Sequence, residues 1–445
     1  MTINPNIKKS PMGVSQMHNF DKHEIKIEKT DSRKEPPNDS YFIASLLFFF
    51  TGLAGALPLH FFLVANDYWM YKLRDPEYET YNLSDKTYYQ KMFTSVSLAV
   101  QGFPCMISAY LSAKFALKID VRKRFLFTLA IISFLFVIFT SLVKINTDGW
   151  QTVFFITSVT VITVIALFHP LYNITMMALL STFPSKYIKL NMYGSAMAGI
   201  FSSCLQIISL SISNSPKDVA MIYFSLGTGI ILFTLFLTYV MKYSPVVEYY
   251  WKGDHEEHVV PSHTLRDFKN VAFIIWPLLI ILVLTNGTSG LGHPNITSLV
   301  VSDGYNDHRD NLWYSKYFVP TVTFLGTDIF SLLGRFFGQA YITRKNSHWF
   351  IILTAVRCFG IGSLFFFCNA RPRNYFPVLF PYDFEYMIIL YLYSFSASFI
   401  MTTVILSSPR MAGDQAEVAF VSIQVVASTT TTLTSFLDPF YVKML

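Results

Sequence analysis

The chain has 445 residues, of which 52% are hydrophobic and only 14% are charged, and its mean hydropathy is +0.41. Soluble domains carry about 25% charged residues, so this composition excludes an ordinary soluble domain, and its hydrophobicity excludes a disordered chain. The net charge of +6 does not indicate a nucleic-acid partner, because the basic residues lie mostly between apolar runs. The composition therefore predicts a polytopic membrane protein in contact with the lipid bilayer.

The apolar runs have the length of transmembrane helices. A bilayer core of roughly 30 Å needs about 20 apolar residues at a rise of about 1.5 Å each, whereas a strand of a membrane barrel needs only about ten. We therefore expect an all-α protein with eleven transmembrane helices. They are predicted at about 42–65, 93–117, 125–143, 151–183, 187–213, 217–243, 271–291, 316–341, 347–368, 384–408 and 416–440.

The distribution of basic residues predicts the orientation. Cytoplasmic segments carry an excess of Lys and Arg. Here that excess falls on the polar tail 1–41 and on the short loop that holds Lys118, Arg122, Lys123 and Arg124. We therefore expect a cytoplasmic N-terminus, and eleven crossings then put the C-terminus outside. No cleavable signal peptide precedes the first apolar run, so we expect that run to be retained.

The longest internal loop, 244–270, separates six predicted helices from five. It predicts two helical bundles, 42–243 and 271–445, joined by a cytoplasmic linker in a major-facilitator-like arrangement. The tail 1–41 precedes them and is expected to be disordered. In this topology the glycosylation sequons at Asn82 and Asn295 lie on the outer side, as glycosylation requires.

Little in the sequence indicates an enzyme. The four cysteines have no metal-ligand spacing and lie in or beside apolar segments, so we expect buried free thiols. They are Cys105, Cys204, Cys358 and Cys368. No paired carboxylates, Ser/His/Asp set or His-rich metal cluster at lumen spacing supports an enzyme, and the sequence has no GxxxxGK[ST] loop for nucleotide binding. We expect no catalysis, no metal and no cofactor.

Three charged residues lie at membrane depth: Asp328, Arg335 and Arg357. Such a residue costs a few kcal/mol and therefore has a partner or a function. Asp328 and Arg335 are seven apart in the stretch that begins at Phe324, so they share a helix face with an axial offset of roughly 10 Å. A polar ligand, a water or Ser331 fits between them, which predicts a solute site along this stretch. The alternative is a structural pair, or an Arg335 that reaches the cytoplasmic interface. Arg357 has no acidic residue nearby in the sequence, so a role in gating or in holding two helices together fits it as well as contact with the substrate does.

Two further polar residues lie in predicted helices, His60 in the first and Asn173 in the fourth. Each is a candidate to face an aqueous cavity, although a lone histidine in an apolar helix more often bonds a neighbouring helix. Because histidine titrates in the physiological range, His60 also leaves proton coupling open. The threonines of the last helix, Thr431 among them, suit close helix packing or a polar wall.

Several motifs together resemble the equilibrative nucleoside transporter family. They occur in the family's order and cover about 42–440, and the predicted topology and the loop after the sixth helix also agree with the family. The motifs are Leu57-Pro58-Leu59-His60-Phe61-Phe62, Gly194-Ser195-Ala196-Met197-Ala198-Gly199, Trp313 to Pro320 leading through Asp328 to Leu332-Leu333-Gly334-Arg335, Cys368 to Tyr375, and Ala416-Glu417.

The resemblance implies roles for individual residues. Arg335 matches the family arginine at the nucleoside ribose. Asp328 matches an amide position one turn before the usual acid, and Ser331 stands where the family has that acid. Asn173 matches a glutamine that reads the nucleobase, and it keeps an amide on a shorter stem.

The resemblance also implies a base pocket that differs from the common type. Leu59 stands in place of a family tryptophan, His60 in place of an asparagine, and His293 at an aromatic position before a proline. Matched positions on the pocket wall are Gly102, Cys105 and Thr431.

These observations together predict a multi-pass plasma-membrane carrier of nucleosides or nucleobases. We expect alternating access and facilitated diffusion. One alternative is a proton-coupled nucleoside carrier. Another is a major-facilitator-like carrier of a different small polar or cationic solute, for which twelve helices and a glycine-rich basic motif are usual. A channel or receptor is a further alternative, and saturable uptake with trans-stimulation distinguishes a carrier from it.

Overall fold

The structure is a computed structural model. It describes residues 42–64, 66–76, 87–115, 120–212, 215–241, 244–252, 265–292, 296–305, 311–371 and 375–435, together with Pro37, Asp39, Arg373 and Leu437. Nearly all of the predicted tail 1–41 lies outside these residues, as do Asn82, His293 and Asn295. The contacts within the chain define Asp39–Leu445 as one unit, and only that unit is described below.

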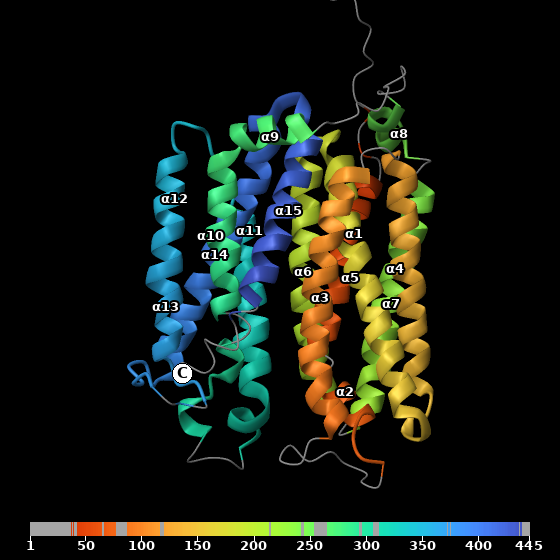
Figure 1. The fold of residues 1–445 in the computed structure, drawn as a ribbon, viewed down its shortest axis with the longest axis vertical. Helices are drawn as coiled ribbons and strands as arrows, with labels where there is room; N and C mark the ends of the chain where they lie inside the picture. The colour runs from red at the N-terminus through yellow and green to blue at the C-terminus, as the bar shows by residue number, and fades with distance from the viewer. Residues whose placement is uncertain are drawn as a thin grey trace, which may run out of the picture. The chain divides into compact units, whose positions relative to one another are not determined.

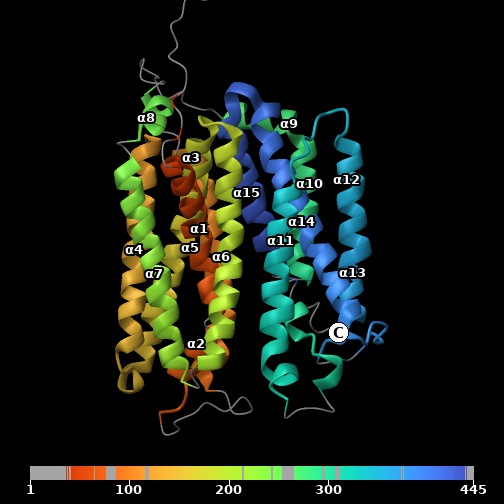
Figure 2. The same cartoon turned by 180° about the vertical axis from the view of Figure 1, so that it is seen from behind.

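Long helices make up the first half of this unit, and we call α1 to α7 the first bundle (Figures 1 and 2). Helix α1 packs along α6 and contacts α7, α3 packs on α5, and α4 packs on α5 and α7. The helices are α1 Ile43–Val64, α2 Asn66–Lys72, α3 Tyr88–Phe115, α4 Val121–Lys144, α5 Gln151–Ser181, α6 Ser185–Ile212 and α7 Pro216–Val240. The predicted linker 244–270 contains α8 Pro245–Lys252 and the start of α9 Leu265–Ile274.

Less regular helices make up the second half, and we call α10 to α15 the second bundle. Helix α11 packs along α14, and α10 packs on α15, α12 and α14. The helices are α10 Trp276–Gly292, α11 Gly326–Phe337, α12 Ser347–Ala355, α13 Gly362–Leu364, α14 Asp383–Ala412 and α15 Ala416–Ser435. Wider π-helical turns precede α11 at Trp313–Tyr317 and Val319–Leu325, and another, Val356–Ile361, joins α12 to α13.

Helices long and apolar enough to cross a membrane occur in both halves. Six pass by length and composition among the described residues, and the bent pair α9 and α10 is a seventh if it counts as one crossing. The predicted helix 271–291 is divided by this bend of 80°, so that its first residues belong to α9 and those from Trp276 onward to α10. The physical reason for the bend is Pro277, which has no N–H to continue a helical ladder and suits the first turn of a new helix. The number of eleven crossings stays a prediction.

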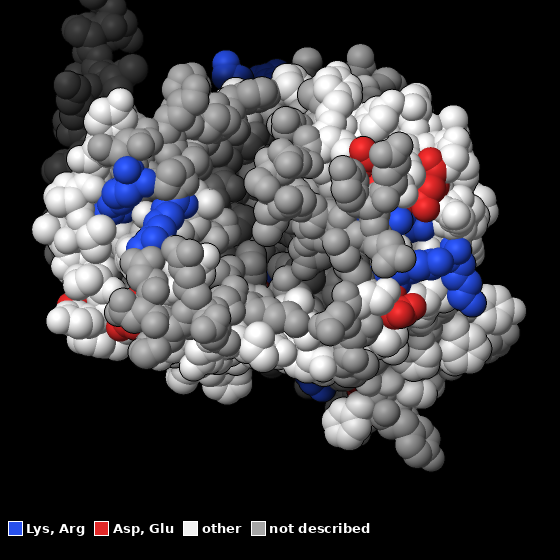
Figure 3. All heavy atoms as spheres, turned by 90° about the horizontal axis from the view of Figure 1, so that it is seen from below, with Lys and Arg blue, Asp and Glu red and all other residues white. Residues whose placement is uncertain are grey.

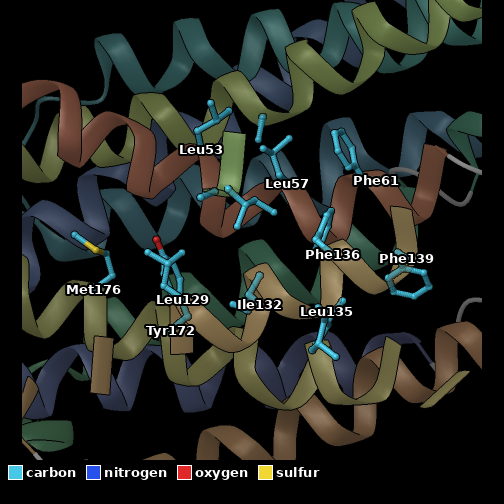
Figure 4. Close-up of a cluster of buried hydrophobic side chains, with 14 of the residues drawn as sticks. Leu53, Leu57, Phe61, Leu129, Ile132, Leu135, Phe136, Phe139, Tyr172 and Met176 are labelled. Atoms are coloured by element: carbon cyan, nitrogen blue, oxygen red, sulfur yellow. The ribbon is translucent and has the colours of Figure 1, made fainter. Parts of the chain in front are cut away.

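The first bundle has a continuous apolar core (Figure 4). Leu57, Phe61 and Phe136 are fully buried in it, and the core extends from α1 through α4 and α5 to α7. Glycines let α1 and α6 approach closely, since a Cβ atom at Gly52 would overlap the Asn191 carbonyl and one at Gly194 the Phe49 carbonyl. The close contact fixes the position of α6, which faces the second bundle.

Candidate functional site

Helix α11 carries both charged residues predicted to line a solute site. Asp328 lies in its first turn and Arg335 in its last. Ser203 Oγ donates to Asp328 Oδ2 at 2.9 Å, while Arg335 Nη1 donates to Met192 O at 2.6 Å and to Ser195 Oγ at 2.9 Å. All three partners belong to α6. The charged face of α11 is therefore turned toward the first bundle.

Small residues allow this approach. A Cβ atom at Gly199 on α6 would overlap the Asp328 carboxylate, and one at Gly334 on α11 would overlap the Phe395 carbonyl of α14. Helix α11 therefore lies in close contact with a neighbour on each side. Asp328 and Arg335 have little freedom to move away from α6 without a movement of the whole helix.

Two adjoining cavities lie beside this contact. The smaller, of about 220 Å³, is lined by Asp328, Arg335 and Arg357 among others. The larger, of about 400 Å³, is lined by residues of both bundles, including Asn173 of α5. His60 and Arg335 line both cavities. Asp328 and Arg357 thus lie at the smaller cavity, the amide side chains lie at the larger one, and both bundles contribute to each.

The larger cavity combines hydrogen-bonding groups with apolar walls. Asn173 Nδ2 lies 3.3 Å from His169 Nε2, and Gln424 and Asn286 also line the cavity. Its other lining side chains include Met176, Met177, Phe420 and Ile423. Such a combination accepts a flat apolar ring system with a few donors and acceptors at its edge.

The smaller cavity is richer in hydroxyl groups. Ser331 Oγ lies 2.6 Å from Ser398 Oγ of α14, so Ser331 is turned toward α14 and does not bridge Asp328 and Arg335 directly. Arg357 is 2% exposed and lies against Tyr393. Charge, hydroxyl groups and limited volume together suit a small ligand with several hydroxyls.

The structure brings six of the predicted site residues to these cavities. They are His60, Asn173, Asp328, Ser331, Arg335 and Arg357. Phe324 and Thr431 are not among the lining residues, and Thr431 is exposed on α15. The side chain of Leu59 and all of His293 lie outside the described residues.

The cysteines are free, as expected, but only Cys358 and Cys368 are buried. Cys105 and Cys204 are partly buried, which corrects the expectation of four buried thiols. Cys105 lies on α3 and Cys204 on α6. Both helices are apolar on several sides, so the sequence does not show which side chains pack against neighbouring helices.

Several residues that line the cavities or bind the charges of α11 were not predicted from the sequence. Ser195 and Ser203 bind the two charges of α11, and His169 and Gln424 line the larger cavity. Ser195 stands within the small-residue motif 194–199, which was a readable signal of close contact. Polar residues such as Gln424 carry no local signal of their partner, because the cavity forms only when distant helices assemble.

Further contacts cross between the bundles at the end that carries α8 and α9 (Figure 1). Arg124 Nη2 of α4 lies 3.3 Å from Glu417 Oε1 of α15, and Arg124 Nε also donates to Thr175 Oγ1 at 2.8 Å. Lys189 Nζ of α6 donates to Gln339 Oε1 after α11 at 2.8 Å. These bonds hold the two bundles together at that end. The opposite face, seen in Figure 3, has a hollow near its middle.

A solved structure shares this architecture. The chain is similar to the proton:xylose symporter XylE of the major facilitator superfamily, with a TM-score of 0.54 and 11% identity, covering 90% of this chain and 88% of that one. At this identity the likeness concerns the fold alone. The fold is helical and major-facilitator-like, and its long apolar helices are those of a multi-pass membrane protein.

The comparison of sequences gives the family. A family model described as "Nucleoside transporter" matches residues 159–428. Equilibrative nucleoside transporter 3 of Rattus norvegicus is 26% identical, over 84% of this chain and 83% of that protein. Equilibrative nucleoside transporter 1 of Homo sapiens is 24% identical, over 84% of this chain and 91% of that protein. The chain belongs to the nucleoside transporter family, which confirms the resemblance, and it is a carrier rather than an enzyme.

Proposed function

We propose that the protein moves nucleosides across the plasma membrane by facilitated diffusion. The observation that carries this proposal is the pair Asp328 and Arg335 beside two cavities between the bundles, in a chain of the nucleoside transporter family. A nucleoside is neutral and rich in donors and acceptors, so a site with an acid, a cation and an amide replaces its lost hydration.

The two cavities suit the two parts of a nucleoside. Asp328 accepts hydrogen bonds from ribose hydroxyls, and Arg335 donates to them, in the cavity of about 220 Å³. Asn173 meets the edge of the base in the cavity of about 400 Å³, where His169 lies within 3.3 Å of its amide. A free nucleobase would fill the larger cavity alone and would forgo the contacts with Asp328 and Arg357, which line only the smaller one.

The proposed topology has eleven crossings, a cytoplasmic N-terminus and an outside C-terminus. Residues 42–243 and 271–445 form the two bundles, 244–270 is the cytoplasmic linker and 1–41 the cytoplasmic tail. The sequons at Asn82 and Asn295 are then available for glycosylation outside. The basic residues of the tail and of the loop before α4 support this orientation.

Alternating access follows if the two bundles rock about the cavities. The bonds Arg124 to Glu417 and Lys189 to Gln339 close the end that bears α8 and α9. In the proposed topology this end is cytoplasmic, so the present conformation faces outward. Inward opening then requires that these bonds break.

The test is uptake of radiolabelled adenosine, uridine, adenine and a cationic monoamine by cells that express the protein and lack their own nucleoside uptake. We expect saturable nucleoside uptake that internal unlabelled nucleoside accelerates. Arg335→Ala should lower it about a hundredfold, because it removes a buried hydrogen-bonded charge. The matched control is Arg344→Ala, an exposed arginine after α11. Absence of nucleoside uptake by surface-expressed protein would overturn the substrate and leave the fold intact.

Proton coupling is a second candidate, and one observation favours it: His60 lines both cavities together with Arg335. Coupling through this residue requires that its imidazole gains and loses a proton during the transport cycle. Coupled transport would rise as the outside is acidified, and His60→Asn would abolish that rise. Uptake that stays flat between about pH 5.5 and pH 8 in both proteins would exclude coupling through this residue.

A further inference from the structure

Arg357 is a buried charge that the proposed site does not yet use. It is 2% exposed and lies in the π-helical turn Val356–Ile361 of the second bundle. Turns of this kind are rare and are frequent at functional sites. An arginine stays charged in proteins, so this position carries a permanent cation at membrane depth.

The partners of Arg357 are few. Its Nε donates to Tyr393 O at 3.3 Å, its guanidinium carbon lies 3.9 Å from the centre of the Tyr393 ring, and Nη1 lies 3.6 Å from Cys358 Sγ. Nη2 is buried and has no hydrogen-bond partner among the described residues, and none of their carboxylates forms an ion pair with Arg357. A buried donor without a partner is costly, more so when it is charged.

The cavity that Arg357 lines also contains Asp328 and Arg335. Two cations therefore face one acid in a volume of about 220 Å³. The remaining polar side chains there include the neutral hydroxyls Ser394 and Ser398. This excess of positive charge attracts a hydrogen-bond acceptor or an anion and opposes the entry of a cationic group.

The ribose has one polar group left for this position. If Asp328 and Arg335 hold the 2′ and 3′ hydroxyls, the remaining exocyclic oxygen of the sugar is at the 5′ carbon. Resting on the proposed function, we infer that Arg357 binds the 5′ oxygen of the nucleoside and makes the carrier discriminate between solutes by the charge of their 5′ substituent. Arg357 is a specificity-determining residue for the ribose end of the site.

The test is competition against uptake of labelled uridine by four adenosines that differ only at the 5′ position. They carry a carboxylate, the natural hydroxyl, no substituent, or an ammonium group from a 5′ amine. For the wild type we expect the carboxylate to inhibit at least as well as the hydroxyl, the 5′-deoxy compound more weakly, and the amine most weakly. The carboxylate and amine should differ by roughly tenfold or more in the concentration for half inhibition, as expected for charge-assisted contacts.

Arg357→Gln keeps a donor and removes the charge. It should lower uridine uptake, because uridine also carries a 5′ hydroxyl, and it should collapse the order of the four competitors to within about threefold in the uptake that remains. The matched control is Arg410→Gln, whose guanidinium lies 3.4 Å from the centre of the Tyr341 ring and which does not line the cavity. It should keep the wild-type order. The same four compounds should also raise the melting temperature of the purified wild-type protein in the same order. This measurement tests the ranking of affinities without any substitution.

The outcomes separate the two proposals. No competition or binding by any nucleoside overturns the proposed function together with this inference. Competition by all four compounds with equal strength in the wild type overturns the inference alone. An Arg357→Gln protein that transports more slowly but keeps the full order would show a structural role and also overturn it.

Discussion

The two bundles differ in how their interiors are built. The first has one continuous apolar core that extends from Phe48 to Phe139 and across to Phe224. The second has two separate apolar clusters. On α14 one cluster ends at Tyr393 and the other begins at Ile400, and the cavity-lining serines 394 and 398 lie between them.

The two bundles also contribute different groups to the cavities. The second bundle supplies the three charged residues that line the smaller cavity, Asp328, Arg335 and Arg357. The π-helical stretch Val319–Leu325 lies just before the first of them, and the stretch Val356–Ile361 contains the last. The first bundle supplies hydrogen-bond partners from the regular helix α6. A rigid scaffold therefore faces a less regular bundle that holds the charges, and the predictions below test that contrast.

Among the changes that test the contrast between the two bundles, the largest effect should come from the close contact of Gly199 with Asp328. Gly199→Ala places a methyl group where the Asp328 carboxylate now lies, so the acid must move and lose its bond from Ser203. We expect nucleoside uptake per surface molecule to fall at least about tenfold, since a buried charge loses its partner. The measurement is initial uptake normalised to surface protein.

The control for this change is another first-bundle glycine. A Cβ atom at Gly229 on α7 meets nothing within 4 Å, so Gly229→Ala should leave uptake unchanged and stabilise the helix slightly. Equal loss in both variants would show that any added methyl group disturbs the first bundle, and the special role of Gly199 would be wrong.

A smaller effect is expected at the ion pair between the bundles. Glu417→Gln leaves Arg124, whose side chain is 2% exposed, with its bond to Thr175 but without its acid. The end of the molecule at which α4 meets α15 then opens more readily, and we expect uptake to change roughly three- to tenfold. The reversed pair, Arg124→Glu with Glu417→Arg, should recover part of the change. If the change in uptake of the double variant equals the sum of the changes in the two single variants, expressed as free energies, the two residues are not coupled.

The same contrast explains which features could be predicted from the sequence. Apolar length predicts helices such as α4 and α14, because a bilayer crossing needs a continuous apolar run. Charge at membrane depth predicts Asp328, Arg335 and Arg357, because such residues are costly without a function or a partner. These signals are local, and the structure places all three residues at the smaller cavity.

Features that depend on distant helices were not predictable in this way. The serines of α6 that bind Asp328 and Arg335 are separated from them by more than a hundred residues, so no spacing reveals the pairs. The bend between α9 and α10 had a local signal in Pro277, but apolar length alone suggested one helix. The placement of Thr431 on an exposed surface likewise depends on how α15 rotates against its neighbours.

The smallest effect on transport should come from the core of the first bundle. Phe136 is fully buried and its ring centre lies 6.2 Å from that of Phe61 (Figure 4). Phe136→Leu should lower the free energy of unfolding by about 1 kcal/mol, seen as a lower melting temperature of the purified protein. Uptake per surface molecule should stay within about twofold of the wild type, because the scaffold contributes no group to the cavities at this point.

The matched change in the second bundle is Tyr393→Leu. Tyr393 is similarly buried, but its hydroxyl donates to Thr288 O at 2.8 Å and its ring lies under the guanidinium of Arg357. Its loss should lower both the melting temperature and the uptake, because Arg357 loses the ring that fixes its position. If the two aromatic substitutions alter uptake equally, the first bundle is not a passive scaffold, and the contrast between the two interiors does not extend to function.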